Sequence, residues 1–227
     1  MAMAMRVALY WAPERTDPLH ELGSRWLGRD AETGAPLPQP SVPGLDIATL
    51  TAEPRRYGLH ATLKPPFHTG ADWGTLREAA MALAARTRPF RLPPLRVAPL
   101  GGFLALREAE SCAALRAFAD SCVEALDRFR IPPDTAELER RQRHGLTPVQ
   151  RALLARWGYP FVKEEWRFHV TLTGRLTEAD LPLARDAAGS FLGRVADRPR
   201  IVRELCLFTQ SAPDVPFRIA ERLPLLG

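Results

Sequence analysis

Alternation of apolar and polar positions marks several segments of this chain as β-strands. Each has the two-residue period of a half-buried strand, and turn-forming or charged residues lie between them. The segments are RVALYW (6–11), GLHATLK (58–64), two strands within 90–108 around Gly101-Gly102, EWRFHVTLTG (165–174), and one each within 198–211 and 217–226. Because side chains alternate across a strand, each segment presents one face to a core and the other to solvent or a ligand.

Apolar residues at helical spacing predict helices between these strands. The predicted helices cover 17–28, about 75–86, 111–129, 148–158 and 176–193. Ser111 is the expected N-cap of the third helix, and Thr177 with Asp180 resembles a capping box at the start of the last. The proline- and glycine-rich stretch 33–44 is expected to be a loop.

The order of these elements repeats along the chain. A strand with His-x-Thr-Leu, then a helix, then a pair of strands occurs at 58–108 and again at 165–226. The repeat indicates a diverged internal duplication, and the alternative is coincidence in an ordinary α+β protein. We expect an α+β fold in which residues 5–227 form a single two-lobed domain, with 131–148 as the connecting segment.

Composition narrows the class of protein only modestly. The 227 residues are 46% apolar and 25% charged, and no apolar run is long enough for a transmembrane helix. The N-terminal residues lack the basic start and long apolar stretch of a signal peptide. Three cysteines without metal-ligand spacing fit reduced thiols, so we expect a cytoplasmic protein. The net charge of +5 fits an anionic small molecule, RNA, or no particular partner, and we expect no membrane partner.

The two strands that carry His-x-Thr-Leu are the most informative segments. On the first, His60, Thr62 and Lys64 are predicted to share one face. On the second, His169 and Thr171 share a face in the same way. One such strand would be interpreted as half-solvated with a polar outer face. Two copies, each followed by a helix, favour a cleft floored by both polar faces.

The other three histidines lack this context. His20 lies in a predicted helix, where a surface or packing role is expected, and His68 follows the first motif strand. His144 belongs to a charged run that is typical of a solvent-exposed face. The hypothesis of a functional histidine pair therefore concerns His60 and His169.

Two imidazoles suit a reaction in which one proton is removed and another is delivered, since the histidine pKa lies near neutrality. Attack on the phosphorus of a phosphodiester is such a reaction. Thr62 and Thr171 could donate to the non-bridging oxygens, and Lys64 could add a positive charge. A metal site is less favoured, because no carboxylate or cysteine accompanies the histidines at ligand spacing. No glycine-rich phosphate loop, nucleophile elbow or dinucleotide fingerprint is present.

The chain resembles the two-histidine phosphoesterase superfamily, which is marked by paired His-x-Thr/Ser motifs. It is most similar to a branch associated with bacterial phosphonate metabolism (DUF1045-like). The resemblance is carried by LTAEPRRYGLHATLKPPF (50–67) and LTPVQRALLARWGYPFVKEEWRFHVTLTGRL (146–176), with RVALYWAP (6–13) and LCLFTQ (205–210) in support. The long second segment is specific, whereas a bare His-x-Thr is not.

The resemblance implies a bilobal fold of two pseudo-symmetric lobes, each with an antiparallel sheet flanked by helices, and a central cleft. His60 and His169 match the catalytic histidines, and Thr62 and Thr171 match the phosphate-binding hydroxyls. Lys64, Tyr57 and Tyr10 are candidate substrate-binding residues, with packing or surface roles as the alternative. No metal and no cofactor is expected.

The leading hypothesis is therefore a metal-independent phosphodiesterase that acts on a cyclic phosphate or small phosphodiester in the context of phosphonate metabolism. Its partner would be a small phosphorylated substrate. The alternatives are a nucleotide or RNA-end binding module, suggested by the basic run RRQR (140–143), and an RNA end-processing or ligating enzyme that uses the same two histidines. The sequence does not distinguish acid from base within the pair.

Overall fold

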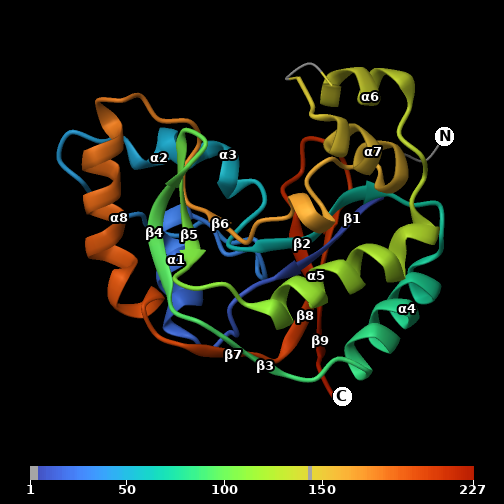
Figure 1. The fold of residues 1–227 in the computed structure, drawn as a ribbon. Coiled ribbons are helices and arrows are strands. Elements are labelled where there is room, and N and C mark those ends of the chain that lie inside the picture. The colour runs from blue at the N-terminus through green and yellow to red at the C-terminus, as the bar shows by residue number, and fades with distance from the viewer. Residues whose placement is uncertain (1–4, 143–144) are drawn as a thin grey trace.

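The computed structural model of the chain describes residues 5–142 and 145–227, and its main sheet has seven strands in the order β4-β5-β6-β2-β1-β8-β9 (Figure 1). Every strand pair is antiparallel. The strands are β1 Arg6–Trp11, β2 Ala61–His68, β4 Leu95–Leu100, β5 Phe103–Glu108, β6 Val170–Thr171, β8 Glu204–Gln210 and β9 Arg218–Pro224. A separate two-stranded antiparallel sheet pairs β3 (Phe90–Leu92) with β7 (Arg200–Val202).

Helices flank both halves of the main sheet. They are α1 Pro18–Leu27, α2 Ile47–Leu50, α3 Ala52–Arg55, α4 Trp73–Ala85, α5 Ala113–Leu126, α6 Thr135–Gln142, α7 Pro148–Trp157 and α8 Asp180–Ala196. In Figure 1, α4 and α5 lie beside the half formed by β2, β1, β8 and β9, whereas α8 lies beside β4 and β5 and packs against α1. The predicted α+β class, with antiparallel strands flanked by helices, is confirmed. The two motif-bearing halves share one continuous sheet, however, because β2 pairs directly with β6.

Local chemistry explains where several helices begin. The Asp17 carboxylate accepts from the Leu19 N–H at the start of α1, and Thr147 and Gln150 form a reciprocal capping box at the start of α7. Thr177 Oγ1 accepts from Asp180 N at 3.1 Å, but α8 has Ala179 as its N-cap without a side-chain capping bond, so the predicted capping box is not formed there. The prediction for Ser111 is wrong, because Cys112 occupies the N-cap of α5 and its side chain makes no capping bond.

The two faces of the sheet are buried differently. On β1, Val7, Leu9 and Trp11 face the main core, which also includes α4 and α5. Ala8 and Tyr10 face the other way, into a smaller cluster that contains Phe208 and Phe217. The face of Tyr10 is the face on which both His-x-Thr motifs lie.

The connecting segment contains more structure than its sequence indicated. Its charged stretch forms α6, whereas His144 lies outside the described residues. The predicted second motif strand is reduced to the two residues of β6. Within the described parts of the chain, no helix combines the length and apolar character needed to cross a bilayer.

Candidate active site

The two His-x-Thr motifs meet where β2 pairs with β6. Ala61 is the partner of Val170 in this antiparallel pair. The register therefore sets Thr62 opposite His169 and His60 opposite Thr171, on one face of the sheet. The two imidazoles are diagonal neighbours, a relation in which Cα atoms lie about 7–8 Å apart. The structure thus brings the four residues into one site, although the two motifs are 109 positions apart in the sequence.

Each histidine is held in the same way by its own backbone. His60 Nδ1 lies 2.9 Å from the Gly58 carbonyl oxygen, and His169 Nδ1 lies 2.8 Å from that of Arg167. A carbonyl oxygen only accepts, so Nδ1 carries the proton in both neutral rings. Neither Nε2 atom has a hydrogen-bond partner among the described residues. Both unprotonated nitrogens are therefore free to exchange a proton with a ligand.

Burial sets the charge state of the pair. It lowers the pKa of His60 to about 4, against the hydrogen bond to Gly58, and the nearby charge of His169 lowers it further. Burial also lowers the pKa of His169, with a smaller contribution in the same direction from Arg107. Both imidazoles are half-buried. Both are therefore neutral at pH 7 in the free protein.

The buried ring of Tyr10 packs against the imidazole of His60. Its ring stacks on the imidazole with centroids 3.9 Å apart, and its hydroxyl shares a hydrogen bond with the Thr62 side chain. Tyr10 is only 1% exposed, so its geometry is that of a positioning residue and not of the substrate-binding residue expected from the sequence. Tyr57 is half-buried beside His60, with ring centroids 6.0 Å apart, and remains a candidate for contact with substrate.

Lys64 does not share the face of His60 and Thr62, and that prediction is wrong. In the β1–β2 register Tyr10 pairs with Thr62 but Leu9 pairs with Lys64, so one extra residue of β2 is inserted between them. This bulge turns Lys64 toward α5. There its ammonium donates to the Val123 carbonyl at 2.9 Å and pairs with Asp127 at 3.4 Å. Burial lowers the pKa of Lys64 to about 8.

A different cation, Arg107, lies beside the histidines. In the β5–β6 pair Ala105 is opposite Thr171, and the register continues to set Arg107 opposite His169. The Arg107 side chain is half-buried, and its Nε is buried without a hydrogen-bond partner in the described chain. An unpaired buried guanidinium N–H is costly unless a ligand satisfies it. Alternation along FLALRE predicts that Arg107 shares a face with Phe103. The sequence near Arg107 does not, however, indicate that this strand pairs with a His-x-Thr strand.

Other sequence candidates lie away from this site. His20 Nε2 is 3.8 Å from Asp30 Oδ1, and His68 is at the opposite end of β2 from His60. Within residues 5–142 and 145–227, no group of three or more His, Cys, Asp or Glu is arranged to hold a metal ion.

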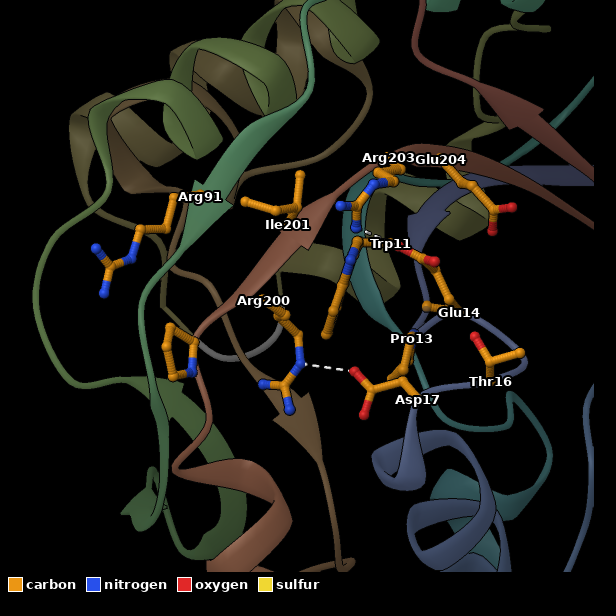
Figure 2. Close-up of a pocket in the computed structure, with 12 residues that line it drawn as sticks. Trp11, Pro13, Glu14, Thr16, Asp17, Arg91, Arg200, Ile201, Arg203 and Glu204 are labelled. Atoms are coloured by element: carbon orange, nitrogen blue, oxygen red, sulfur yellow. Dashed lines mark hydrogen bonds and ion pairs between the residues drawn. The ribbon is translucent and has the colours of Figure 1, made fainter.

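A cavity of about 440 Å³ lies on the other face of the sheet, beside Trp11 and the β3–β7 ribbon (Figure 2). Its charges are largely paired within the protein. Arg200 bonds Asp17 at 2.8 Å, and Arg203 pairs with Glu14 at 3.2 Å. Because Trp11 follows Tyr10 on β1, this cavity and the histidine pair open on opposite faces.

The chain is thus an α+β protein with two half-buried histidines on one face of its main sheet. Within that class, the chain belongs to the family described as "Protein of unknown function (DUF1045)", whose model matches residues 62–218. This confirms the branch predicted from the sequence.

Two curated relatives are similar in sequence to nearly the whole of this chain. The chain is 38% identical to "Ribose 1,5-bisphosphate phosphokinase PhnN" of Janthinobacterium sp. (strain Marseille), over 98% of the chain and 51% of the relative. It is 37% identical to the protein of the same name from Laribacter hongkongensis (strain HLHK9), over 98% and 52%. The chain thus spans about half the length of the curated relatives it matches.

Solved structures show a more distant likeness. A structure described as a phosphoesterase has a TM-score of 0.44 at 14% identity, covering 99% of both chains. E. coli LigT complexed with NADP+ has a TM-score of 0.44 at 16% identity, again covering 99% of both chains.

Proposed function

We propose that this chain is a metal-independent phosphoesterase that opens a cyclic phosphate or cleaves a small phosphodiester. The observation that carries the proposal is the diagonal pair His60 and His169, each with Nδ1 bound to its own backbone and Nε2 free. Two equivalent imidazoles on adjacent strands supply one general base and one general acid.

In the proposed reaction, one Nε2 takes the proton of an attacking water or hydroxyl as the new P–O bond forms. The other imidazole, protonated at Nε2, gives its proton to the leaving oxygen as the old P–O bond breaks. Thr62 and Thr171 lie beside the opposite imidazoles, where their hydroxyls would donate to the non-bridging oxygens. Arg107 would supply the positive charge that the sequence had suggested for Lys64.

The curated relatives are named for ribose 1,5-bisphosphate, a small sugar phosphate. This supports a small phosphorylated substrate, although the kinase activity in that name belongs to proteins about twice as long. Together with the family resemblance to phosphonate-associated proteins, it favours a phosphoribosyl cyclic phosphate as the first substrate to test.

A binding module for nucleotides or RNA ends is the alternative, because α6 carries adjacent arginines at 140 and 141. RNA binding through phosphate contacts would weaken steeply with salt, whereas turnover of a small cyclic phosphate would depend on salt far less. An RNA end-processing or ligating enzyme would require RNA ends as substrates.

The test is a screen of cyclic and linear phosphodiesters with EDTA present throughout, read by release of the phosphomonoester. Turnover of a small cyclic phosphate that is unaffected by the chelator is expected. Salt-sensitive RNA binding without turnover of any phosphodiester would overturn the proposal in favour of the binding module.

The lowered histidine pKa values predict the pH dependence. One imidazole must be protonated in the free enzyme, so kcat/KM should be maximal on the acid side of pH 6.5. A bound phosphate favours the imidazolium, so the kcat profile should lie at higher pH than the kcat/KM profile.

The same pKa shift predicts the pH dependence of stability. Folding disfavours protonation of His60, so the free energy of unfolding should fall as pH falls from 6.5 to about 4. Urea midpoints as a function of pH measure the stability, and pH–rate profiles measure kcat and kcat/KM. A kcat/KM that rises only above pH 7 would contradict the predicted rate profile.

Replacing Arg107 tests its part in the site. Arg107→Gln should lower kcat by about 10–100-fold, the range for losing a charge-assisted hydrogen bond to the reacting phosphate. Arg107→Lys should retain more activity, because it keeps the charge without the forked donors. The matched control is Arg96→Gln, on neighbouring β4, where the side chain is 65% exposed and pairs with Asp197. Equal kcat in Arg107→Gln and wild type would remove Arg107 from the mechanism.

A further inference from the structure

A cluster of aromatic rings leads away from His60 along the Tyr10 face of the sheet. Tyr10 and Tyr57 both contact the imidazole, with centroid distances of 3.9 and 6.0 Å. Phe217 continues the cluster, with its ring centroid 6.4 Å from Tyr10 and 5.2 Å from Tyr57, and its ring is nearly parallel to that of Tyr57. Tyr10 and Phe217 are each only 1% exposed, so the half-buried Tyr57 is the ring of this cluster that can contact the apolar or flat part of a ligand.

Arg6 lies over the Phe217 end of this cluster. It precedes Tyr10 by four residues on β1, so both side chains lie on the same face, roughly 13 Å apart at the backbone. Its guanidinium carbon is 5.4 Å from the centroid of Phe217, and Nη1 donates to Gln210 Oε1 at 2.7 Å. In the described chain Arg6 has no carboxylate partner, so its charge is uncompensated.

Helix α6 brings a second arginine, Arg141, to the neighbourhood of His68. Arg141 and Tyr159 line a cavity of about 280 Å³ together with His68, which is the cross-strand partner of Arg6. The Arg141 guanidinium lies 5.5 Å from the Tyr159 ring and is oriented by an ion pair with Glu137. Burial lowers the pKa of Arg141, the charge of Glu137 opposes this shift, and the charge of Arg6 adds slightly to it. The geometric link between the two arginines is His68, which is opposite Arg6 in the β1–β2 pair and lines the same cavity as Arg141.

We propose that Arg6 and Arg141 form a second anion subsite, separated from the histidine pair by the half-buried ring of Tyr57. The substrate class is then a small cyclic phosphodiester that carries a separate phosphate monoester. The inference rests on the proposed function for the reacting phosphate, but it concerns the other end of the ligand. A monoester carries nearly two negative charges and suits a pair of arginines better than a neutral hydroxyl does.

The binding test compares adenosine 3′,5′-bisphosphate with adenosine 3′-monophosphate by titration calorimetry at 150 mM salt. Wild type should bind the bisphosphate about 10–100-fold more tightly, the range for one or two charge-assisted hydrogen bonds. Arg6→Gln and Arg141→Gln should each bring this ratio toward one, and Arg6→Lys should keep part of it. Arg96→Gln, on the exposed edge strand β4, should keep the wild-type ratio. A wild-type ratio of one, or an unchanged ratio in both glutamine variants, would overturn the subsite.

The turnover test separates this inference from the proposed function. It compares adenosine 2′,3′-cyclic phosphate with and without a 5′-phosphate, and a higher kcat/KM for the 5′-phosphorylated compound is expected. Hydrolysis of both at equal kcat/KM would overturn the subsite and leave the phosphoesterase intact. Hydrolysis of neither, with the bisphosphate preference and its arginine dependence retained, would support the subsite and count against the phosphoesterase.

Discussion

Replacing either histidine of the pair by alanine is expected to lower kcat/KM for a cyclic phosphodiester by roughly 10²–10⁴-fold. His60→Ala removes one Nε2 from the site and His169→Ala removes the other, and neither of the other two described histidines, His20 and His68, lies beside the pair. Each turnover needs one proton taken and one given, so a site with a single imidazole lacks either its base or its acid. Steady-state kinetics of the purified variants with EDTA present would measure the loss.

The double variant adds information about how the pair works. If both histidines serve the same step, removing the second should cost little beyond the more damaging single replacement. The matched control is His20→Gln, in α1, where the imidazole lies near Asp30 and not near the motifs. That variant should keep wild-type kcat/KM. Turnover that persists in the double variant would show that the mechanism is wrong.

Gly58→Ala is expected to be the most damaging small change to folding near the site. Gly58 has a φ of +79°, a left-handed conformation that costs an alanine about 1–2 kcal/mol. A Cβ there would lie 2.3 Å from the Ala31 Cβ, and such overpacking typically costs a further 1–3 kcal/mol. We therefore expect the free energy of unfolding to fall by about 2–5 kcal/mol, as measured by urea denaturation at pH 7.

A second change separates the two contributions. In Ala31→Gly with Gly58→Ala, the nearest remaining atom of residue 31 is its Cα at 3.4 Å, so the overpacking should be relieved and the backbone strain should remain. The Gly58 carbonyl also holds His60 Nδ1, so a shifted backbone should lower kcat in the single variant even below its unfolding transition. A Gly58→Ala protein with wild-type urea midpoint and kcat would refute this account.

Much of the site could be predicted from sequence because alternation along a strand is a local property. The His-x-Thr spacing alone predicts that each hydroxyl shares a face with its imidazole, and the antiparallel pairing of Ala61 with Val170 then makes one site of two motifs. The same alternation failed at Lys64, two residues beyond Thr62. A bulge shifts the register there, just before Pro65 and Pro66, and a two-residue period does not reveal an inserted residue.

The parts that sequence reasoning missed depend on contacts between distant segments. Arg107 enters the site through the register of β5 with β6, and Arg141 through the placement of α6, a helix absent from the prediction. In a chain where nearly every cation is arginine, composition does not distinguish these two from the rest. Tyr10 was found by its position in a matching stretch, but its burial beneath His60 could not be read from alternation alone.

The shortness of β6 bears on how the protein moves. Its two residues make one ladder pair with β2 and two with β5, so the two halves of the main sheet are joined by very few strand pairs where the His-x-Thr motifs meet. A small rocking of one half against the other about that seam would change the gap between the imidazoles while every longer ladder stayed whole. Binding of a ligand between the two halves and the spacing of the two imidazoles would then change together in the same motion.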